Sequence, residues 1–440
     1  MTKNRVTLPA AQATSFDGDA VRVDTDLLVP GRGEPTKDGT LVYSTKTGKI
    51  VYAGSQSSLP AMYATLAISI KVPVLMPGLW DCHVHFFGEA DGNLERLVQL
   101  APALAGMRAA RDVAATLNAG YTSVREVGGY GVDFVKAIDE GWMPGPHIYG
   151  AGAAISQTAG HGDLHGIPLE MMHHQINHGL PFCLADGVEG AIKAVRTQIR
   201  RGAKVIKICS TGGVMSKIDS PQAAQFTKSE IEAMVEEATR TNMLVAAHAH
   251  GTEGIIAALK AGVKTIEHGS YLTKEAIDLM IEKDAILVAT RLIQVNGLRN
   301  PQNMPEGSYK KLLVVEQENK KSYEAAIKAG VKCALGTDLG LSSVASHFIH
   351  GMNGEEFGFA VEAGMSPLQA IEAGTANGPD TLGPQAPLSG QLKEGYDADF
   401  IALSEDPVKN IGVLAEVEKV THVWKGGKLM KAPGKPLSIF

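Results

Sequence analysis

One phrase recurs along the chain and limits what it can fold into. It occurs as NAGYTSVREV from Asn118, RRGAKVIKICS from Arg200, KAGVKTIEHGS from Lys260 and KAGVKCALGTD from Lys328. In each copy a polar helix end precedes a glycine, the residue type that most often ends a helix in the left-handed conformation. A short run rich in Val and Ile follows, and such runs suit parallel strands buried on both faces. The repeated unit is therefore helix, loop and strand.

Further apolar runs between these copies complete a set of eight predicted strands. The strands start at Val72, Tyr121, His147, Val205, Leu244, Lys264, Ala285 and Lys332. Eight strands that alternate with helices predict an α/β fold, a (β/α)8 barrel. In such a barrel the reactive side chains lie at the carboxyl ends of the strands.

The two ends of the chain do not follow this pattern. TKTGKIVYAG from Thr45 has the composition of a hairpin, and so do GYDADFIALSEDP and VTHVWKGGKLMK near the C-terminus. We predict that residues 1–71 and 385–440 together form a small β-sandwich domain and that residues 72–384 form the catalytic barrel. Residues 163–186 are rich in His, Met and Pro and predict a long loop over the barrel mouth.

Composition and charge narrow the class of partner. The net charge is −6 and 20% of the residues are charged, which argues against a nucleic-acid-binding surface and favours a small-molecule partner. No run of 18 apolar residues occurs, and the first residues are polar, so neither a membrane span nor a signal peptide is expected. The 4 cysteines lie far apart, as is typical of reduced thiols, and we expect a cytoplasmic protein.

Two histidines stand one residue apart directly after a buried apolar run, in LMPGLWDCHVHFFG. Because side chains alternate along a strand, His83 and His85 share one face and Val84 takes the other. A single histidine at such a place is usually a hydrogen-bonded core residue. A pair on one face favours ligands of a metal ion.

The other predicted strands also end in polar residues: Lys207, His248, His250, His268 and Asp338. Lys207 is unusual because an unpartnered charged lysine in an apolar strand costs several kcal/mol. It either forms an ion pair, with Asp338 or Glu267 as candidate partner, or its amine is converted to a carbamate that bridges two metal ions. The whole set favours a metal centre.

This set resembles the binuclear metal centre of the amidohydrolase superfamily. The resemblance includes the order of His83, His85, Lys207, His248, His268 and Asp338 and the phrases DTDLLVPGRGEP, VLMPGLWDCHVH, ALGTD and GMSPLQAIEAGTANGP. Three more phrases, SQTAGHGD, RRGAKVIKICSTGGVMS and GPQAPLSGQLKEGYDAD, resemble the subgroup that contains ochratoxinase and Xaa-Pro dipeptidases and is related to imidazolonepropionase.

The resemblance implies a role for each ligand. His83, His85 and Asp338 would hold one metal ion, His248 and His268 the other, and carboxylated Lys207 would bridge the two. Imidazole nitrogens together with oxygen anions favour Zn2+. Asp338 would also orient the attacking water and carry its proton to the leaving amine.

Four residues are candidates for substrate contacts. The same resemblance implies that His161 would polarise the scissile carbonyl, although a loop histidine can equally hydrogen-bond backbone, and the other three follow from their positions after predicted strands. Arg291 and Tyr271 would receive a substrate α-carboxylate, because a guanidinium matches a carboxylate with two hydrogen bonds. The alternative for Arg291 is an ion pair within the protein. His250 would lie behind the ligands or contact substrate.

The expected activity is hydrolysis of an amide to an amino acid, with the phenylalanine amide of ochratoxin A, N-acyl amino acids and dipeptides as substrates. A second possibility is opening of a cyclic amide, as in imidazolonepropionase. A third possibility is a metal-free scaffold protein. The presence of a suitable residue at all six ligand positions argues against it. The resemblance further implies a homo-oligomer.

Overall fold

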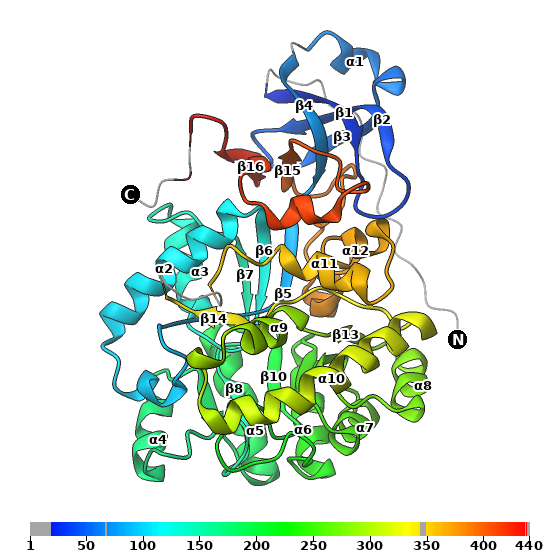
Figure 1. The fold of residues 1–440 in the computed structure, drawn as a ribbon. Helices are drawn as coiled ribbons and strands as arrows, with labels where there is room; N and C mark the ends of the chain where they lie inside the picture. The colour runs from blue at the N-terminus through cyan, green and yellow to red at the C-terminus, as the bar shows by residue number, and fades with distance from the viewer. Residues whose placement is uncertain (1–18, 67, 344–348, 436, 438–440) are drawn as a thin grey trace.

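Parallel strands and helices alternate through the middle of the chain, as the repeated phrase predicts (Figure 1). The structure is a computed structural model that describes residues 19–66, 68–343, 349–435 and 437. Two sheets carry the central strands. One contains, in spatial order, β13 (Ile286–Val288), β12 (Thr265–His268), β11 (Val245–Ala249), β10 (Ile206–Cys209), β8 (Ala154–Ser156) and β9 (Phe182–Leu184). The other contains β14 (Leu339–Leu341), β5 (Leu79–Glu89), β6 (Tyr121–Glu126) and β7 (His147–Gly150).

All strand pairs within these two sheets are parallel. In the described part of the chain, no ladder joins β7 to β8 or β13 to β14, so the hydrogen bonds do not close a ring of strands. The predicted strand from Lys332 is reduced to one bridge, between Cys333 and Leu287 of β13. The α/β class is confirmed, and two parallel sheets stand where the sequence predicts one closed barrel.

Helices connect these strands along the chain. They are α2 (Pro102–Asn118), α3 (Gly131–Asp139), α4 (Leu169–Asn177), α5 (Gly187–Arg201), α6 (Lys228–Arg240), α7 (Thr252–Ala261), α8 (Lys274–Glu282), α9 (Arg291–Arg299), α10 (Glu306–Ala329), α11 (Glu355–Glu362) and α12 (Pro367–Ala373). None of the helices that the structure describes has the length and apolar character needed to cross a bilayer.

The glycines of the repeated phrase end helices as predicted. Gly202, Gly262 and Gly330 follow α5, α7 and α10 with φ of 95°, 100° and 84°. In this left-handed region a β-carbon is costly, so glycine is favoured there. Each glycine turns the chain back toward the next parallel strand.

A third sheet has seven strands and takes them from both ends of the chain (Figure 1). Its order is β17 (Lys428–Lys431), β16 (Val420–Lys425), β15 (Phe400–Leu403), β4 (Ile68–Pro77), β1 (Ala20–Leu28), β2 (Thr36–Ser44) and β3 (Ile50–Ser55), with α1 (Ala61–Ala64) before β4. The predicted union of the two ends is present. The ladders of the described residues join all seven strands into one sheet, whereas the predicted sandwich has two.

The strand predicted from Val72 belongs to this terminal sheet. β4 pairs with β1 and β15, and the first strand of the central sheets is β5, which starts at Leu79. Gly78 separates the two strands, and a β-carbon there would lie 2.0 Å from Thr122 Oγ1. The residues from Val72 to Phe87 form one nearly continuous apolar run, in which periodicity does not show where one sheet ends.

The predicted loop over residues 163–186 is also wrong in part. It contains α4 and the short strand β9, which pairs with β8. Met172 of α4 and Phe182 of β9 are buried in one apolar cluster with Leu164. The segment therefore has a packed core of its own. The sequence pattern does not show this core, because its apolar side chains are widely spaced and meet only after the chain folds back.

Candidate metal centre

Polar side chains from several central strands line one pocket. The strand register aligns them, since Cys209 at the end of β10 pairs with His248 of β11, and Ala249 pairs with His268 at the end of β12. The structure brings together all six residues expected as ligands, and His161 and His250 join them. The lining includes His83, His85, His161, Lys207, His248, His250, His268 and Asp338.

The first group of possible ligands comes from β5 and the residue before β14. His83 and His85 lie on one face of β5 with ring centroids 5.2 Å apart, while Val84 is buried on the other face. Asp338 Oδ1 lies 3.5 Å from His83 Nε2 and 3.0 Å from His85 Nε2. The ligand atoms of these three residues all lie within 4.8 Å of one another.

The second group consists of three histidines. His248, His250 and His268 also place their ligand atoms within 4.8 Å of one another, and all three are buried. From the sequence we expect His250 either to support the ligands from behind or to contact the substrate. In the structure its ring stacks on that of His268, with centroids 4.9 Å apart, so it lies beside the expected ligands.

Hydrogen bonds fix which ring nitrogen of each β5 histidine is free. His83 Nδ1 lies 2.7 Å from Glu267 Oε2, and His85 Nδ1 lies 2.6 Å from the Gly128 carbonyl oxygen. A carbonyl or a carboxylate only accepts, so each Nδ1 carries a proton and donates. The Nε2 atoms keep their lone pairs and point toward Asp338, as metal-binding histidines require.

The three histidines of the second group are held in the same manner. His248 Nε2 donates to the Gly212 carbonyl oxygen at 3.1 Å, which leaves a lone pair on Nδ1. His268 Nδ1 lies 2.7 Å from Thr290 Oγ1, and His250 Nδ1 lies 2.7 Å from Ser270 Oγ. Each ring therefore has one nitrogen engaged by the protein and the other available.

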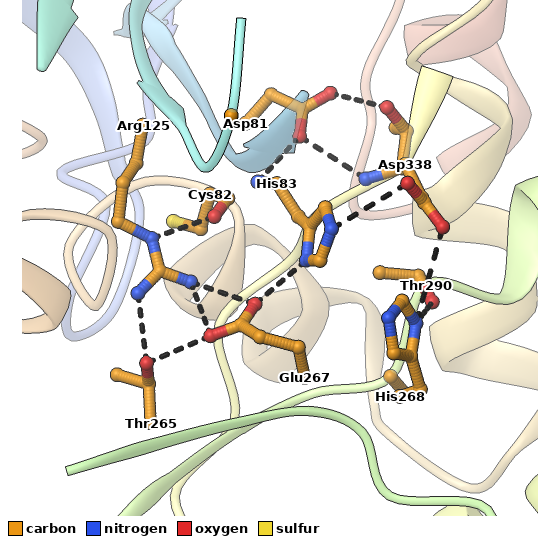
Figure 2. Close-up of polar contacts among 12 residues, drawn as sticks. Asp81, Cys82, His83, Arg125, Thr265, Glu267, His268, Thr290 and Asp338 are labelled. Carbon is orange, nitrogen blue, oxygen red and sulfur yellow. Dashed lines mark hydrogen bonds and ion pairs between the residues drawn. The ribbon is translucent and has the colours of Figure 1, made fainter. Parts of the chain in front are cut away.

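A buried ion pair stands behind His83 (Figure 2). Arg125 Nη2 lies 2.8 Å from both Glu267 oxygens, and Thr265 Oγ1 donates to Oε1 at 2.7 Å. Burial alone would raise the pKa of Glu267, but Arg125 and His83 together hold it well below its usual range. An ionised Glu267 keeps the proton on His83 Nδ1.

Asp81 holds the chain around the first group from another side (Figure 2). Its carboxyl group accepts hydrogen bonds from the His83 and Thr337 backbone N–H groups, each at 3.1 Å, and from Thr337 Oγ1 at 2.7 Å. Asn353 Nδ2 adds a fourth hydrogen bond at 2.8 Å. Asp81 therefore links β5 to the segment that carries Asp338. Burial raises the pKa of Asp81 to about 6.

The sequence patterns indicated no role at the site for Arg125 or Asp81, and Glu267 is expected from them only as a partner of Lys207. A signal was present, because SVREV from Ser123 places two charges in a predicted buried strand, and VIKIC places one. Such charges are almost always paired. Which residue each one pairs with depends on strands that are distant in the sequence.

Four of the imidazoles, those of His83, His248, His250 and His268, are uncharged at neutral pH. Burial lowers the pKa of His83 to about 4 and that of His250 to about 3. Burial and the neighbouring imidazoles also hold the pKa of His248 and of His268 well below the usual value. Metal ions bind the deprotonated forms of imidazole and carboxylate. Neutral rings, oriented lone pairs and an ionised Asp338 therefore fit divalent metal ions.

Lys207 of β10 is buried, with 3% of its surface exposed, and lines the same pocket as these candidate ligands. Burial lowers the pKa of its ammonium group, although the Glu267 and Asp338 carboxylates act to raise it. No described carboxylate lies within ion-pair distance of Lys207, whereas Glu267 pairs with Arg125. The ion-pair interpretation of Lys207 therefore has no partner in the described residues.

The backbone is strained at two of the expected ligands. His268 and Asp338 have φ of 71° and 60°, in the left-handed region that costs non-glycine residues about 1–3 kcal/mol. Asn319 Nδ2 donates to the His268 carbonyl oxygen at 2.6 Å, and the Asp338 N–H donates to the His83 carbonyl oxygen at 2.7 Å. These contacts hold conformations that turn both side chains into the pocket.

Arg291 and Tyr271 do not lie in the pocket that holds the histidines. The Arg291 guanidinium is buried, forms an ion pair with Glu316 and donates to Asn319 Oδ1 at 3.0 Å. The Tyr271 N–H donates to the His250 carbonyl oxygen at 2.9 Å. Arg291 therefore has a protein carboxylate as its partner, which is the alternative interpretation of this residue, while the substrate contact expected of Tyr271 stays a prediction.

His161 lies in the turn after β8, and its ring stacks on that of His248 with centroids 4.0 Å apart. Its Nδ1 lies 2.9 Å from Ser216 Oγ, so a side chain engages it instead of the backbone. The rest of the pocket is largely apolar. Its walls include Phe87, Leu94, Phe182, Met215, Ile293 and Leu312.

Comparisons with known proteins agree with this geometry. Residues 74–430 match the amidohydrolase family. The chain is 46% identical to ochratoxinase from Aspergillus niger over 443 aligned positions, which cover 97% of this chain and 90% of the relative. The crystal structure of A. niger ochratoxinase superposes with a TM-score of 0.87 and covers 94% of this chain and 96% of that one. A Xaa-Pro dipeptidase, crystallised with methionine in its active site, is 30% identical, with a TM-score of 0.81 and coverage of 94% and 100%.

Proposed function

The chain belongs to the amidohydrolase family, and we propose that it hydrolyses amides that link an acyl group to an amino acid, with two divalent metal ions in the histidine pocket. One observation carries the proposal. Each of the five histidines in the two ligand groups has one nitrogen held by the protein and the other available in the pocket. A purely structural histidine cluster would not need this orientation.

We propose that His83, His85 and Asp338 hold one metal ion, and His248 and His268 the other. Zinc suits imidazole nitrogens combined with carboxylate oxygens. Bound metal ions of this kind lower the pKa of a water molecule and polarise a carbonyl group. His83, His248 and His268 have a lowered pKa and Asp338 is ionised, so these four groups would release few protons when metal ions bind at neutral pH.

Lys207 would supply a further oxygen ligand as a carbamate. Its neutral amine nitrogen attacks the carbon of CO2, forms an N–C bond and releases one proton, which leaves an anionic carboxylate on the lysine. Burial supports this step because the lowered pKa favours the neutral amine. The absence of a described ion-pair partner removes the competing use of the amine.

Asp338 is the residue placed to move protons. Its carboxylate lies within 3.5 Å of both β5 histidines, its pKa is held below its usual value, and it faces the pocket. Burial opposes this lowered pKa, while His83 and His85 produce it. We propose that Asp338 accepts the proton of the attacking water and returns it to the leaving amine.

The apolar walls favour a substrate with an apolar acyl group or side chain. Phe87, Phe182 and Met215 offer aromatic and thioether surfaces that match an aryl group. The 46% identity to ochratoxinase supports including the phenylalanine amide of ochratoxin A among the substrates to assay. N-acyl amino acids and dipeptides belong to the same chemical class.

Two finer expectations remain proposals. Parallel pairing throughout both central sheets, and the bridge from Cys333 to Leu287, support a barrel that closes around the pocket. An experimental structure with metal bound would test closure. The homo-oligomer rests on the resemblance alone, and sedimentation of the purified protein would test it.

The proposal is tested by metal analysis together with a substrate panel. We expect about two equivalents of divalent metal, loss of activity with a chelator, and recovery on addition of Zn2+. The panel contains ochratoxin A, N-acyl amino acids, dipeptides and a cyclic imide. Turnover of the cyclic imide alone would contradict the proposed substrate class, and full activity in metal-free protein would contradict the metal centre.

A further inference from the structure

The loop after β10 supplies part of the pocket wall but has little backbone structure of its own. Its residues Val214 and Met215, here called the wall residues, line the histidine pocket. A bridge between Thr211 and Ala224 closes the base of the loop. In the described chain, residues 213–219 belong to no helix or strand and form no backbone–backbone hydrogen bond. Side chains must therefore decide where the wall residues lie.

Lys311 of α10 holds this loop through a single ammonium group. Its Nζ donates to the Gly213 carbonyl oxygen at 3.0 Å and to the Ser216 carbonyl oxygen at 2.7 Å. Nζ also lies 3.3 Å from Asp219 Oδ1. A lysine ammonium group has three N–H donors, so these three acceptors occupy all of them. The hydrogen-bonding capacity of Lys311 is therefore directed at one loop, 92 to 98 residues away in the sequence.

The two carbonyl groups that Lys311 binds flank the wall residues. No other residue lies between Gly213 and Ser216, so fixing both carbonyl groups fixes the path of the backbone that carries the two wall side chains. Leu312, next to Lys311 on α10, is buried and lines the same pocket. Lys311 therefore ties the wall from the loop to the wall from α10.

This anchor is better protected from solvent than the other ion pair of the loop. The Lys311 side chain is 20% exposed. Lys217 pairs with Glu95 at 2.7 Å, but the Lys217 side chain is 58% exposed. An exposed ion pair contributes little to stability because water and salt screen it. Lys311 is therefore the contact that sets the position of the loop.

We propose that Lys311 is a positioning residue that fixes Val214 and Met215 as the wall for the apolar part of the substrate, and that it thereby determines the preference for aryl substrates over small ones. The proposal rests on the proposed amide hydrolysis and adds a residue that governs its specificity. A loop that is already ordered offers its apolar surface to an aryl group without the entropy cost of ordering it on binding. A small substrate gains little from that wall.

Four variants separate this role from general support of the fold. Lys311→Met removes the ammonium group and keeps an unbranched apolar side chain. Lys311→Arg is the conservative variant, since it keeps the positive charge and several N–H donors. Met215→Ala removes one wall side chain and leaves Lys311 in place. Lys310→Met is the matched control, because Lys310 is the preceding residue of α10 and pairs with Glu306 at the surface.

The activity readout is the ratio of kcat/KM for N-benzoyl-phenylalanine to kcat/KM for N-acetyl-alanine. We expect this ratio to fall about tenfold in Lys311→Met, through a higher KM for the aryl substrate, which corresponds to about 1.4 kcal/mol. Lys311→Arg should lose less, and Lys310→Met should keep the ratio. A general loss of folded protein would lower both values of kcat/KM equally. An unchanged ratio in Lys311→Met overturns the proposal.

A double-mutant cycle tests whether Lys311 acts through the wall. We expect Met215→Ala to lower the same ratio. Lys311→Met should then have a much smaller effect in the Met215→Ala background than in the unaltered protein, because a side chain that Lys311 positions is gone. Effects of the two substitutions that simply multiply overturn the proposal.

Ligand binding to the metal-free protein gives a readout without catalysis. Fluorescence titration with naphthamide, a neutral aryl amide, should give a dissociation constant about tenfold higher in Lys311→Met than in the unaltered protein, and an unchanged one in Lys310→Met. Equal constants in Lys311→Met and the unaltered protein, or no binding to the unaltered protein, overturn the proposal. If no amide is turned over but naphthamide binding weakens as expected, the proposed function fails while the positioning role of Lys311 holds.

Discussion

Glu267 Oε2 lies 2.7 Å from His83 Nδ1, and this contact between strands 184 residues apart decides which nitrogen of His83 faces the pocket. Glu267 is ionised because Arg125 pairs with it through two contacts of 2.8 Å. The buried ion pair therefore orients His83, a proposed metal ligand, and neither Arg125 nor Glu267 shows this role by its position in the sequence.

Substitution of Glu267 tests this role. In Glu267→Gln, Arg125 loses the carboxylate that compensates its buried charge, so we expect stability to fall by about 3–5 kcal/mol. The Nδ1 partner of His83 also becomes neutral, and we expect zinc affinity to fall roughly 10- to 100-fold. Urea unfolding and a competitive zinc titration measure the two effects.

The matched control for that substitution is Glu372→Gln. Glu372 pairs with Arg32 at the surface. The Arg32 side chain is 43% exposed and the Glu372 side chain 34%. Its loss should cost less than about 1 kcal/mol and leave zinc affinity unchanged. Equal effects of the two substitutions would contradict the role of the buried pair.

Substitution of Lys207 tests the carbamate. Lys207→Ala should lower activity at least roughly a hundredfold and reduce the metal content, because the oxygen ligand proposed on Lys207 would be lost. Propionate or another short carboxylic acid should restore part of the activity by placing a carboxylate in the vacated space. Lys204→Ala, at an exposed lysine just before β10, is the control and should keep full activity. Full activity in Lys207→Ala would rule out the bridge.

Substitution of Arg291 separates structural from substrate roles. Arg291→Met leaves Glu316 and Asn319 without their buried partner, and we expect stability to fall by about 3–5 kcal/mol. Selectivity between an N-acyl amino acid and the matching carboxamide should not change, because Arg291 lies outside the pocket. Arg299→Met, at a more exposed ion pair with Glu355, should cost far less. A KM that rises only for the free carboxylate would restore the substrate-binding role.

The stability of the metal-free protein should depend on pH between about 6.5 and 4. Burial lowers the pKa of His83 and of His350 from 6.5 to about 4 in the folded protein. The unfolded chain takes up these protons first as the pH falls, so each ring costs on the order of 3 kcal/mol of stability by pH 4. Urea unfolding at a series of pH values measures this loss.

Two histidine variants make the pH experiment specific. His350→Gln removes one of the buried titrating rings and should give a shallower loss of stability below pH 6.5. His174→Gln changes an exposed histidine of α4 and should reproduce the slope of the unaltered protein. Buried carboxyl groups with a raised pKa, such as Asp81, change the stability in the opposite direction over this range, so the test is the difference between variants. A pH dependence of stability in His350→Gln identical to that of the unaltered protein would contradict the lowered pKa of His350.

The sequence predicted most of the strands and that the six candidate ligands lie together, because both follow from local patterns. Tyr121 and His147 start strands at the predicted residues, and the strands expected from Val205 and Leu244 begin one residue later. Alternation along β5 places His83 and His85 on one face, and parallel strands bring their carboxyl ends to one edge of a sheet. Such regularities repeat over a few residues and are visible in the chain itself.

The tertiary structure alone decided which partner each polar side chain meets. Arg291 looks the same in the sequence whether it binds a substrate carboxylate or Glu316, and only the packing of α9 against α10 makes it an internal ion pair. Ser216 and Asp219 become partners of His161 because a loop after β10 folds over the turn after β8. Hydrogen bonds and ion pairs act over a few ångströms between residues far apart in the chain, so local periodicity fixes the elements while folding fixes the contacts.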